Sequence, residues 1–208
     1  MDLHHYLLYL VVASLTIASP GPGVVLSISN SILFGFRASV PGILGVSLGM
    51  FTISLIAASG VGSIVHASAI AFSILKYLGA AYLVYLGVKL WRSEGIGLKA
   101  VAPALSSQPT STYKRFKEGL FITLSNPKPM VFFIALYPQF ITKDVDYLPQ
   151  FAILSITFCV LIILIHFGYA LFAGKIRGWI NNKSGSRIIN RTSGLCFIGF
   201  ALGLAINK

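Results

Sequence analysis

The chain has 208 residues, of which 56% are hydrophobic and 10% are charged, and its mean hydropathy is +0.84. Repeated apolar runs of about 20 residues match the hydrocarbon thickness of a bilayer, so the composition excludes a soluble globular domain. The formal net charge of +11 would suggest a nucleic-acid partner in a soluble protein. Here the basic residues lie in short loops, which predicts contact with anionic lipid headgroups and no nucleic acid.

Six membrane-spanning helices are predicted, at residues 3–28, 40–63, 69–90, 117–141, 148–172 and 192–206. The expected fold is an all-α membrane protein, a single polytopic domain over residues 1–208. The first segment does not resemble a signal peptide, because no Lys or Arg precedes it and the apolar run continues too far. Five spans with the N-terminus inside remain an alternative, since Leu3 to Phe34 is long enough to hold an irregular entry.

Basic residues alternate between the two sets of loops. Lys143 and Lys208 lie on one side, and twelve of the 16 Lys and Arg residues lie on the other: Arg37, Lys89, Arg92, Lys99, Lys114, Arg115, Lys117, Lys175, Arg177, Lys183, Arg187 and Arg191. The positive-inside rule places these twelve in the cytoplasm and both termini outside.

One long loop divides the chain into two halves. Residues 92–115 are the predicted cytoplasmic linker, rich in Ser, Gly and Pro towards its centre, between a first half at 1–91 and a second half at 116–208. Each half holds three predicted spans, and an odd number forces the halves into opposite orientations. This arithmetic predicts a 3+3 inverted repeat.

The first and fourth predicted spans are broken at matching places by similar motifs. Ser19-Pro20-Gly21-Pro22 and Asn126-Pro127-Lys128-Pro129 both read as a capping residue, Pro, any residue, Pro. Proline removes a backbone donor and clashes with the preceding turn, whereas Ser and Asn favour helix starts and Pro favours the first helical position. Two restarted helices would direct free N–H groups toward a shared anion site. The alternative is that the prolines only kink helices for packing.

Two titratable residues within the predicted spans are candidates for function, Lys128 and His166. A lysine at mid-span, Lys128, costs about 2.5–3.5 kcal/mol on insertion scales and indicates a functional site, although snorkelling to the cytoplasmic face is an alternative. His166 is the candidate proton carrier, because a histidine side chain can bind and release a proton near neutral pH. A packing role is the alternative. All five acids lie near span ends or in loops: Asp2, Glu94, Glu118, Asp144 and Asp146.

No cofactor or metal site is predicted. Cys159 and Cys196 read as small buried hydrophobes, and the spans carry no Cys, His or carboxylate cluster with ligand spacing. Small-residue faces, Gly42, Gly45 and Gly49 in the second span and Gly199 and Gly203 in the sixth, indicate close helix packing and would allow a homodimer.

Several motifs resemble the LysE/RhtB superfamily of bacterial amino-acid exporters, in its RhtB-like branch of the homoserine, threonine and leucine efflux type. The match covers nearly the whole chain and rests on five stretches: Ser19–Pro22, Gly35–Arg37, Gly79–Gly87, Asn126–Phe133 and Tyr137–Phe140. Family members often have a small residue after the Asn-Pro-Lys triplet, where this chain has Pro129. The resemblance implies a multi-pass protein of the bacterial inner membrane that exports a small neutral amino acid or derivative by proton antiport, and no enzyme.

The residues assigned to the substrate on this reading are Ser19, Pro20, Gly21, Pro22, Asn126, Pro127 and Lys128, with His166 for the proton. Export of another small solute or a cation within the superfamily, and a membrane adaptor without transport, remain alternatives. An intramembrane enzyme is disfavoured, because no acid lies inside the spans and His166 lacks a recognisable partner.

Overall fold

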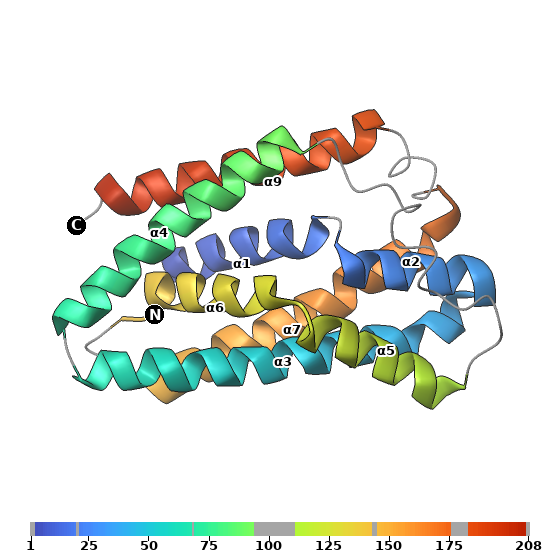
Figure 1. Ribbon diagram of the computed structural model, residues 1–208, viewed down its shortest axis with the longest axis horizontal. Helices are drawn as coiled ribbons and strands as arrows, with labels where there is room; N and C mark the ends of the chain where they lie inside the picture. Colours follow the sequence, from blue (N-terminus) through green and yellow to red (C-terminus); the bar gives the residue numbers. More distant parts are fainter. Residues whose placement is uncertain are drawn as a thin grey trace.

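Helices make up all the regular structure that the computed structural model describes (Figure 1), which covers residues 3–19, 21–67, 69–93, 111–142, 145–175 and 183–206. The all-α prediction is confirmed. The helices are α1 (Leu3–Ala18), α2 (Pro22–Phe34), α3 (Phe36–Ala67), α4 (Ala69–Arg92), α5 (Thr112–Leu124), α6 (Pro127–Phe140), α7 (Tyr147–Leu171) and α9 (Lys183–Ile206).

Three helices, α3, α4 and α7, are long and apolar enough to cross a membrane alone. Two bent pairs raise the number to as many as five if each is one broken span: α1 with α2, bent by 59°, and α5 with α6, bent by 65°. The structure therefore has a sharp bend between helices at each of the two predicted breaks. The sixth predicted span, 192–206, lies within α9, which begins earlier, at Lys183, and is not among these five. The six-span arrangement stays a prediction.

Two predicted boundaries differ from the structure. The first span was expected to end at residue 28, but α2 continues to Phe34 and stops where Gly35 adopts a φ of 83°. Only glycine reaches this left-handed region without strain, so the turn is local chemistry that hydropathy does not report. On the other side of the linker, α5 begins at Thr112, inside the predicted 92–115, because the Ser111 side chain accepts a hydrogen bond from the Lys114 backbone N–H. Residues 94–110 lie outside the described part of the chain.

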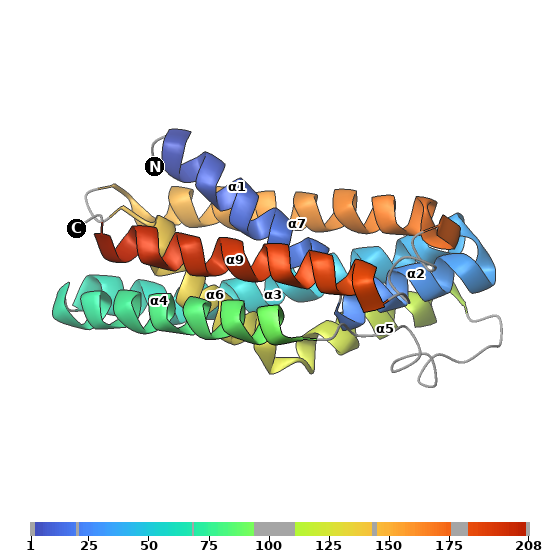
Figure 2. The same ribbon diagram turned by 90° about the horizontal axis from the view of Figure 1, so that it is seen from above.

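The two halves have the same order of elements, a bent pair followed by two long helices. The α3 helix packs on α5 and α6, its counterpart α7 packs on α1 and α2, and α4 packs along α9. In both views the two termini lie at the same end of the molecule (Figures 1 and 2). If the two halves exchanged places, the same kinds of helix contact would result. An inverted repeat would produce this pairing, and it remains a prediction.

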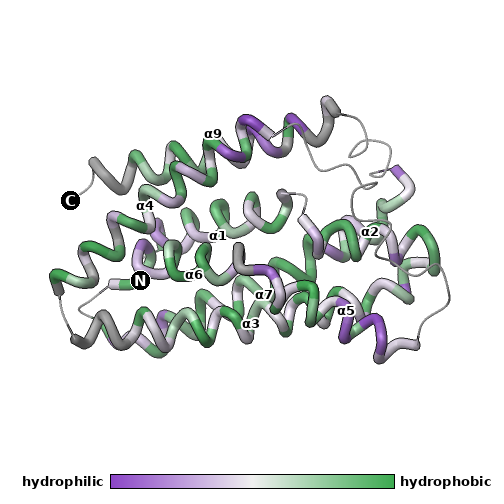
Figure 3. Tube along the Cα trace, viewed as in Figure 1, coloured by the Kyte–Doolittle hydropathy of each residue, from purple (hydrophilic) through white to green (hydrophobic). Residues whose placement is uncertain are grey.

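Polar residues are concentrated toward the other end. The first turns of α5 and stretches in the first half of α9 are among the most hydrophilic, whereas the middle of the molecule is mostly apolar apart from a hydrophilic stretch at the α5–α6 break (Figure 3). We call the end that carries the α2–α3 turn and the first turns of α5 the basic end, because Arg37, Lys114, Arg115 and Lys117 belong to it. The helices α5 and α9 both start toward this end (Figure 1).

Two helix pairs approach each other at glycines. A Cβ at Gly45 of α3 would lie 2.0 Å from the Phe116 carbonyl oxygen of α5, and a Cβ at Gly194 of α9 would lie 2.5 Å from the Gly87 carbonyl oxygen of α4. The close packing predicted for the second span is thus confirmed. In the sixth span the prediction was wrong at Gly199, where a Cβ would meet nothing within 4 Å. The contact uses Gly194 instead, one helical turn nearer the start of α9.

The Gln150 side chain stabilises the connection between α6 and α7 by hydrogen bonds to its backbone. The side chain is 3% exposed; its Oε1 accepts from the Thr142 N–H at 2.9 Å, and its Nε2 donates to the carbonyls of Thr142, Val145 and Asp146 at 3.0–3.2 Å. We expect Gln150→Leu to lower the free energy of unfolding by about 1–3 kcal/mol, because backbone groups at the turn lose the hydrogen bonds that this side chain makes. Thermal melting in detergent measures this, with the lipid-exposed Leu148→Ala as control. An unchanged melting temperature for Gln150→Leu would refute the role.

Candidate functional site

The two helix breaks line one cavity near the middle of the molecule. Both breaks lie at the same level along its long axis (Figure 1), and the cavity between them has a free volume of about 110 Å³. On this measure a single water needs ~10–15 Å³, so the space admits a small organic molecule. From the predicted site, Ser19, Gly21, Pro22, Asn126 and His166 all lie on its wall.

At the first break, side chains from distant helices donate to carbonyls in the last turn of α1. The Tyr169 hydroxyl of α7 donates to the Ala18 carbonyl at 2.6 Å, and the Ser193 hydroxyl of α9 donates at 3.3 Å to the Leu15 carbonyl, which also accepts from the Ser19 N–H. Without water, freed backbone groups need such partners. Sequence reasoning missed Tyr169 and Ser193, since nothing in their own segments indicates where the break will lie.

The restart of the first broken helix differs from the prediction. The α2 helix begins at Pro22, the second proline of its motif, with Gly21 as N-cap and no side-chain cap. Ser19 therefore does not cap α2; it is 7% exposed, and its Oγ has no hydrogen-bond partner. The first helical bond runs from Val25 N–H to Gly21 O, so the N–H groups of the two preceding residues, both on the cavity wall, have no acceptor within the helix.

At the second break the restart comes one proline earlier. The α5 helix ends at Leu124 with Ser125 as C-cap, Asn126 N–H donates to the Thr123 carbonyl at 3.1 Å, and α6 begins at Pro127. The two motifs are thus alike in sequence but not in helical register. Thr123, Asn126 and Pro129 face the cavity. Pro20 lies outside the described residues, as do the side chains of Pro127 and Lys128, so the structure does not place the lysine's charge.

His166 projects from α7 against α2. It is 4% exposed, and its Nδ1 lies 3.0 Å from Ser27 Oγ, which also donates to the Gly23 carbonyl at 2.9 Å. A hydroxyl has one proton, so this network assigns the proton of the neutral imidazole to Nδ1 and leaves Nε2 an acceptor. Ser27 is a partner that the sequence did not indicate. Among the described residues on the cavity wall, His166 is the one titratable side chain.

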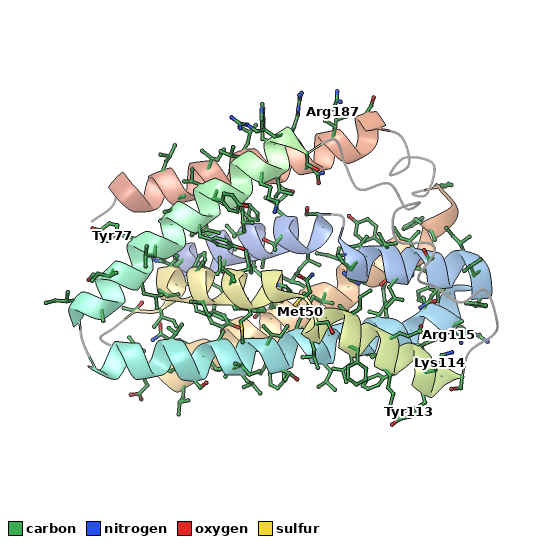
Figure 4. All side chains as sticks on the ribbon, viewed as in Figure 1. Met50, Tyr77, Tyr113, Lys114, Arg115 and Arg187 are labelled. Carbon is green, nitrogen blue, oxygen red and sulfur yellow. The ribbon has the colours of Figure 1, made fainter. Side chains whose placement is uncertain are left out.

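The cavity wall carries both polar and apolar side chains. Thr16, Ser19, Thr123, Asn126 and His166 supply its polar groups. The remaining wall is aliphatic and aromatic, including Phe132, Phe133, Phe158, Phe197 and Met50, the last labelled near the centre of the molecule in Figure 4. A small molecule with one strongly polar end and a short apolar part fits this wall. Within the described ranges, no group of three His, Cys, Asp or Glu residues could hold a metal ion.

Comparison with known proteins gives one family. Residues 14–208 match the LysE type translocator family. The chain is 35% identical over 208 residues to an uncharacterized membrane protein of Vibrio cholerae, with both chains covered in full. It is 35% identical over 199 residues to the homoserine/homoserine lactone efflux protein of Salmonella typhimurium, covering 95% of this chain and 94% of that protein. An uncharacterized membrane protein of Bacillus subtilis is 28% identical over 205 residues. No solved structure matches the chain.

Proposed function

The chain belongs to the LysE type translocator family, and on this premise we propose that it is a secondary active exporter of a small neutral amino acid or a close derivative. The single observation that carries the proposal is the shared cavity. Residues of both Pro motifs, more than 100 positions apart in the chain, meet on its wall. The relatives from Salmonella, named for efflux of homoserine and its lactone, support a substrate of this size.

The substrate's carboxylate is assigned to the helix restarts. The N–H groups of Gly23 and Val24 at the start of α2 carry the positive end of the helix dipole. At the start of α6 two of the first four residues are prolines, so Lys128 and Met130 supply its backbone donors. The Lys128 ammonium adds the fixed positive charge that a carboxylate neutralises. The aromatic wall then takes the apolar part of the substrate.

Alternating access around this site follows from the two breaks. Each bent pair joins its half-helices at an angle, 59° and 65°, so the halves can rock about the breaks while the substrate stays between them. Substrate binding and proton exchange bias the two conformations only through different affinities for them. We assign the protein to the bacterial inner membrane with the basic end in the cytoplasm.

The direct test is excretion. Cells loaded with dipeptides that release homoserine, threonine, leucine or alanine are compared with and without the protein, and the medium is assayed for free amino acids. Excretion of at least one of them, several-fold above the control, is expected. Excretion of none would refute amino-acid export and favour another solute or an adaptor role.

Proton coupling is assigned to His166. We expect His166→Gln to lower proton-driven uptake into inside-out vesicles at least tenfold, because the amide cannot take up and release a proton. Exchange of labelled for unlabelled substrate, which needs no net proton movement, should continue. Ser155→Ala, on the same helix but bonded to Tyr137 away from the cavity, serves as control. Undiminished proton-driven transport by His166→Gln would exclude this residue from coupling.

A further inference from the structure

Two buried donors without acceptors lie at the junction of α2, α3 and α5, outside the central cavity. Arg115 is 8% exposed and its Nε has no hydrogen-bond partner among the residues that the structure describes; Asn30 is 3% exposed and the same holds for its Nδ2. An unpaired buried polar group costs about 1–3 kcal/mol, and an unpaired buried charge costs more. Two such groups from different helices at one junction indicate a ligand that supplies the acceptor.

The Asn30 side chain and the Arg115 backbone both lie beside Gly42 of α3. A Cβ placed there would lie 3.2 Å from Asn30 Nδ2 and 3.6 Å from the Arg115 carbonyl oxygen. The Arg115 guanidinium stacks over Phe34, its Cζ 4.6 Å from the ring centroid, and Phe34 lies one turn after Asn30 on α2. Figure 4 shows Arg115 in the first turns of α5, at the basic end. The stacking positions the guanidinium but supplies no acceptor for its Nε.

The junction continues the walls of the central cavity. Gly23 and Thr123 line that cavity on α2 and α5. Asn30 follows Gly23 by two helical turns, and Arg115 precedes Thr123 by about two, so both lie roughly 10–12 Å from the cavity toward the basic end. Leu26 separates the two places: it is 1% exposed, and its Cδ2 lies 3.7 Å from the same Cβ position at Gly42. In this conformation the route between them is closed.

We propose that Arg115 and Asn30 form a carboxylate-binding station at the basic end, which holds the substrate's carboxylate before it enters the central cavity. This inference rests on the proposed function for the identity of the ligand. The chemistry favours an oxyanion, because the two side-chain atoms left without a partner are both N–H donors and Arg115 adds a fixed positive charge. A lipid phosphate carries the same chemistry but would have to reach beneath Phe34, whereas the exposed Lys114 on the same helix turn is open to headgroups.

The test compares a substrate that has a carboxylate with one that lacks it. Homoserine has a free carboxylate, and in its lactone that group is esterified within the ring. In proteoliposomes containing the full chain, Arg115→Gln and Asn30→Leu should each raise the KM for homoserine about tenfold with kcat little changed. The KM for the lactone should stay within about twofold. Lys114→Gln is the matched control and should leave both KM values unchanged.

Three outcomes would overturn the station. Equal effects on both substrates would indicate a structural role for Arg115, and no effect on either would exclude it. A KM effect seen in vesicles with phosphatidylglycerol and absent in vesicles of phosphatidylcholine alone would assign the site to a lipid headgroup.

A second measurement distinguishes a failure of the proposed function from a failure of the carboxylate-binding station. If the wild type transports neither compound, the melting temperature of the purified protein is measured with sodium acetate and with sodium chloride at equal ionic strength. A stabilisation specific to acetate that Arg115→Gln and Asn30→Leu both abolish supports the station. Its absence in the wild type overturns it.

Discussion

Lys128→Ala is expected to abolish export while the protein remains in the membrane at its normal level. A lysine at this depth costs about 2.5–3.5 kcal/mol to insert, so its removal relieves that cost and should not harm assembly. The transported carboxylate, in contrast, loses the fixed charge that binds it. A charge-assisted contact of this kind contributes roughly 1.5–3 kcal/mol, and loss of coupling between binding and rocking would reduce transport further.

Excretion from loaded cells measures the effect, and the amount of protein in the membrane fraction is measured in parallel. Lys89→Ala is the control, because Lys89 is an exposed residue in the last turn of α4 whose ammonium lies 5.7 Å from the Tyr85 ring centroid. Lys128→Arg separates charge from shape and should keep partial activity. If Lys128→Ala exported substrate at the wild-type rate, Lys128 would not be part of the substrate site.

Gly45→Ala is expected to give the second large loss. The new Cβ would lie 2.0 Å from the Phe116 carbonyl oxygen and 2.9 Å from the Leu120 nitrogen, both backbone atoms of α5. A backbone cannot rotate away as a side chain can, so α5 must move by roughly 1 Å or more to reach a normal contact. Overpacking of this kind costs about 1–3 kcal/mol, and the shift carries the second break with it.

We expect a lower melting temperature and at least tenfold slower export for Gly45→Ala. Gly60→Ala is a matched control on the same helix, since a Cβ there meets nothing within 4 Å, and it should leave both measurements unchanged. A Gly45→Ala variant with normal stability and normal export would show that the contact between α3 and α5 is not needed in either conformation.

Much of the fold could be predicted because its signals are local. The apolar runs of α3, α4 and α7 and the proline pairs at 20–22 and 127–129 predict long helices and two breaks, and the structure contains them. The glycines of the second span indicated close packing, and Gly45 contacts the α5 backbone as expected. These features depend on residues within a few turns of one another, so the physical chemistry of a short segment is enough.

The candidate site was predictable only in part. The sequence placed a candidate proton carrier at His166, yet its partner Ser27 is 139 residues away and could not be inferred from either segment. Likewise, the matching motifs suggested matching restarts, whereas α2 begins at the second proline of its motif and α6 at the first. Near the first break, the Tyr169 hydroxyl binds the Ala18 carbonyl, and packing between α1 and α7 brings these groups together.

The sequence by itself therefore determined that this is a helical membrane protein with two Pro-broken helices, because hydropathy and the missing proline N–H are properties of neighbouring residues. Only the tertiary structure decided that Ser19 and Asn126 line the same cavity and that the unpaired donors of Asn30 and Arg115, on different helices, lie where α2, α3 and α5 pack together. Such meetings depend on how helices distant in sequence cross and in what register. Close packing over the whole bundle sets those crossings, and no single segment encodes them.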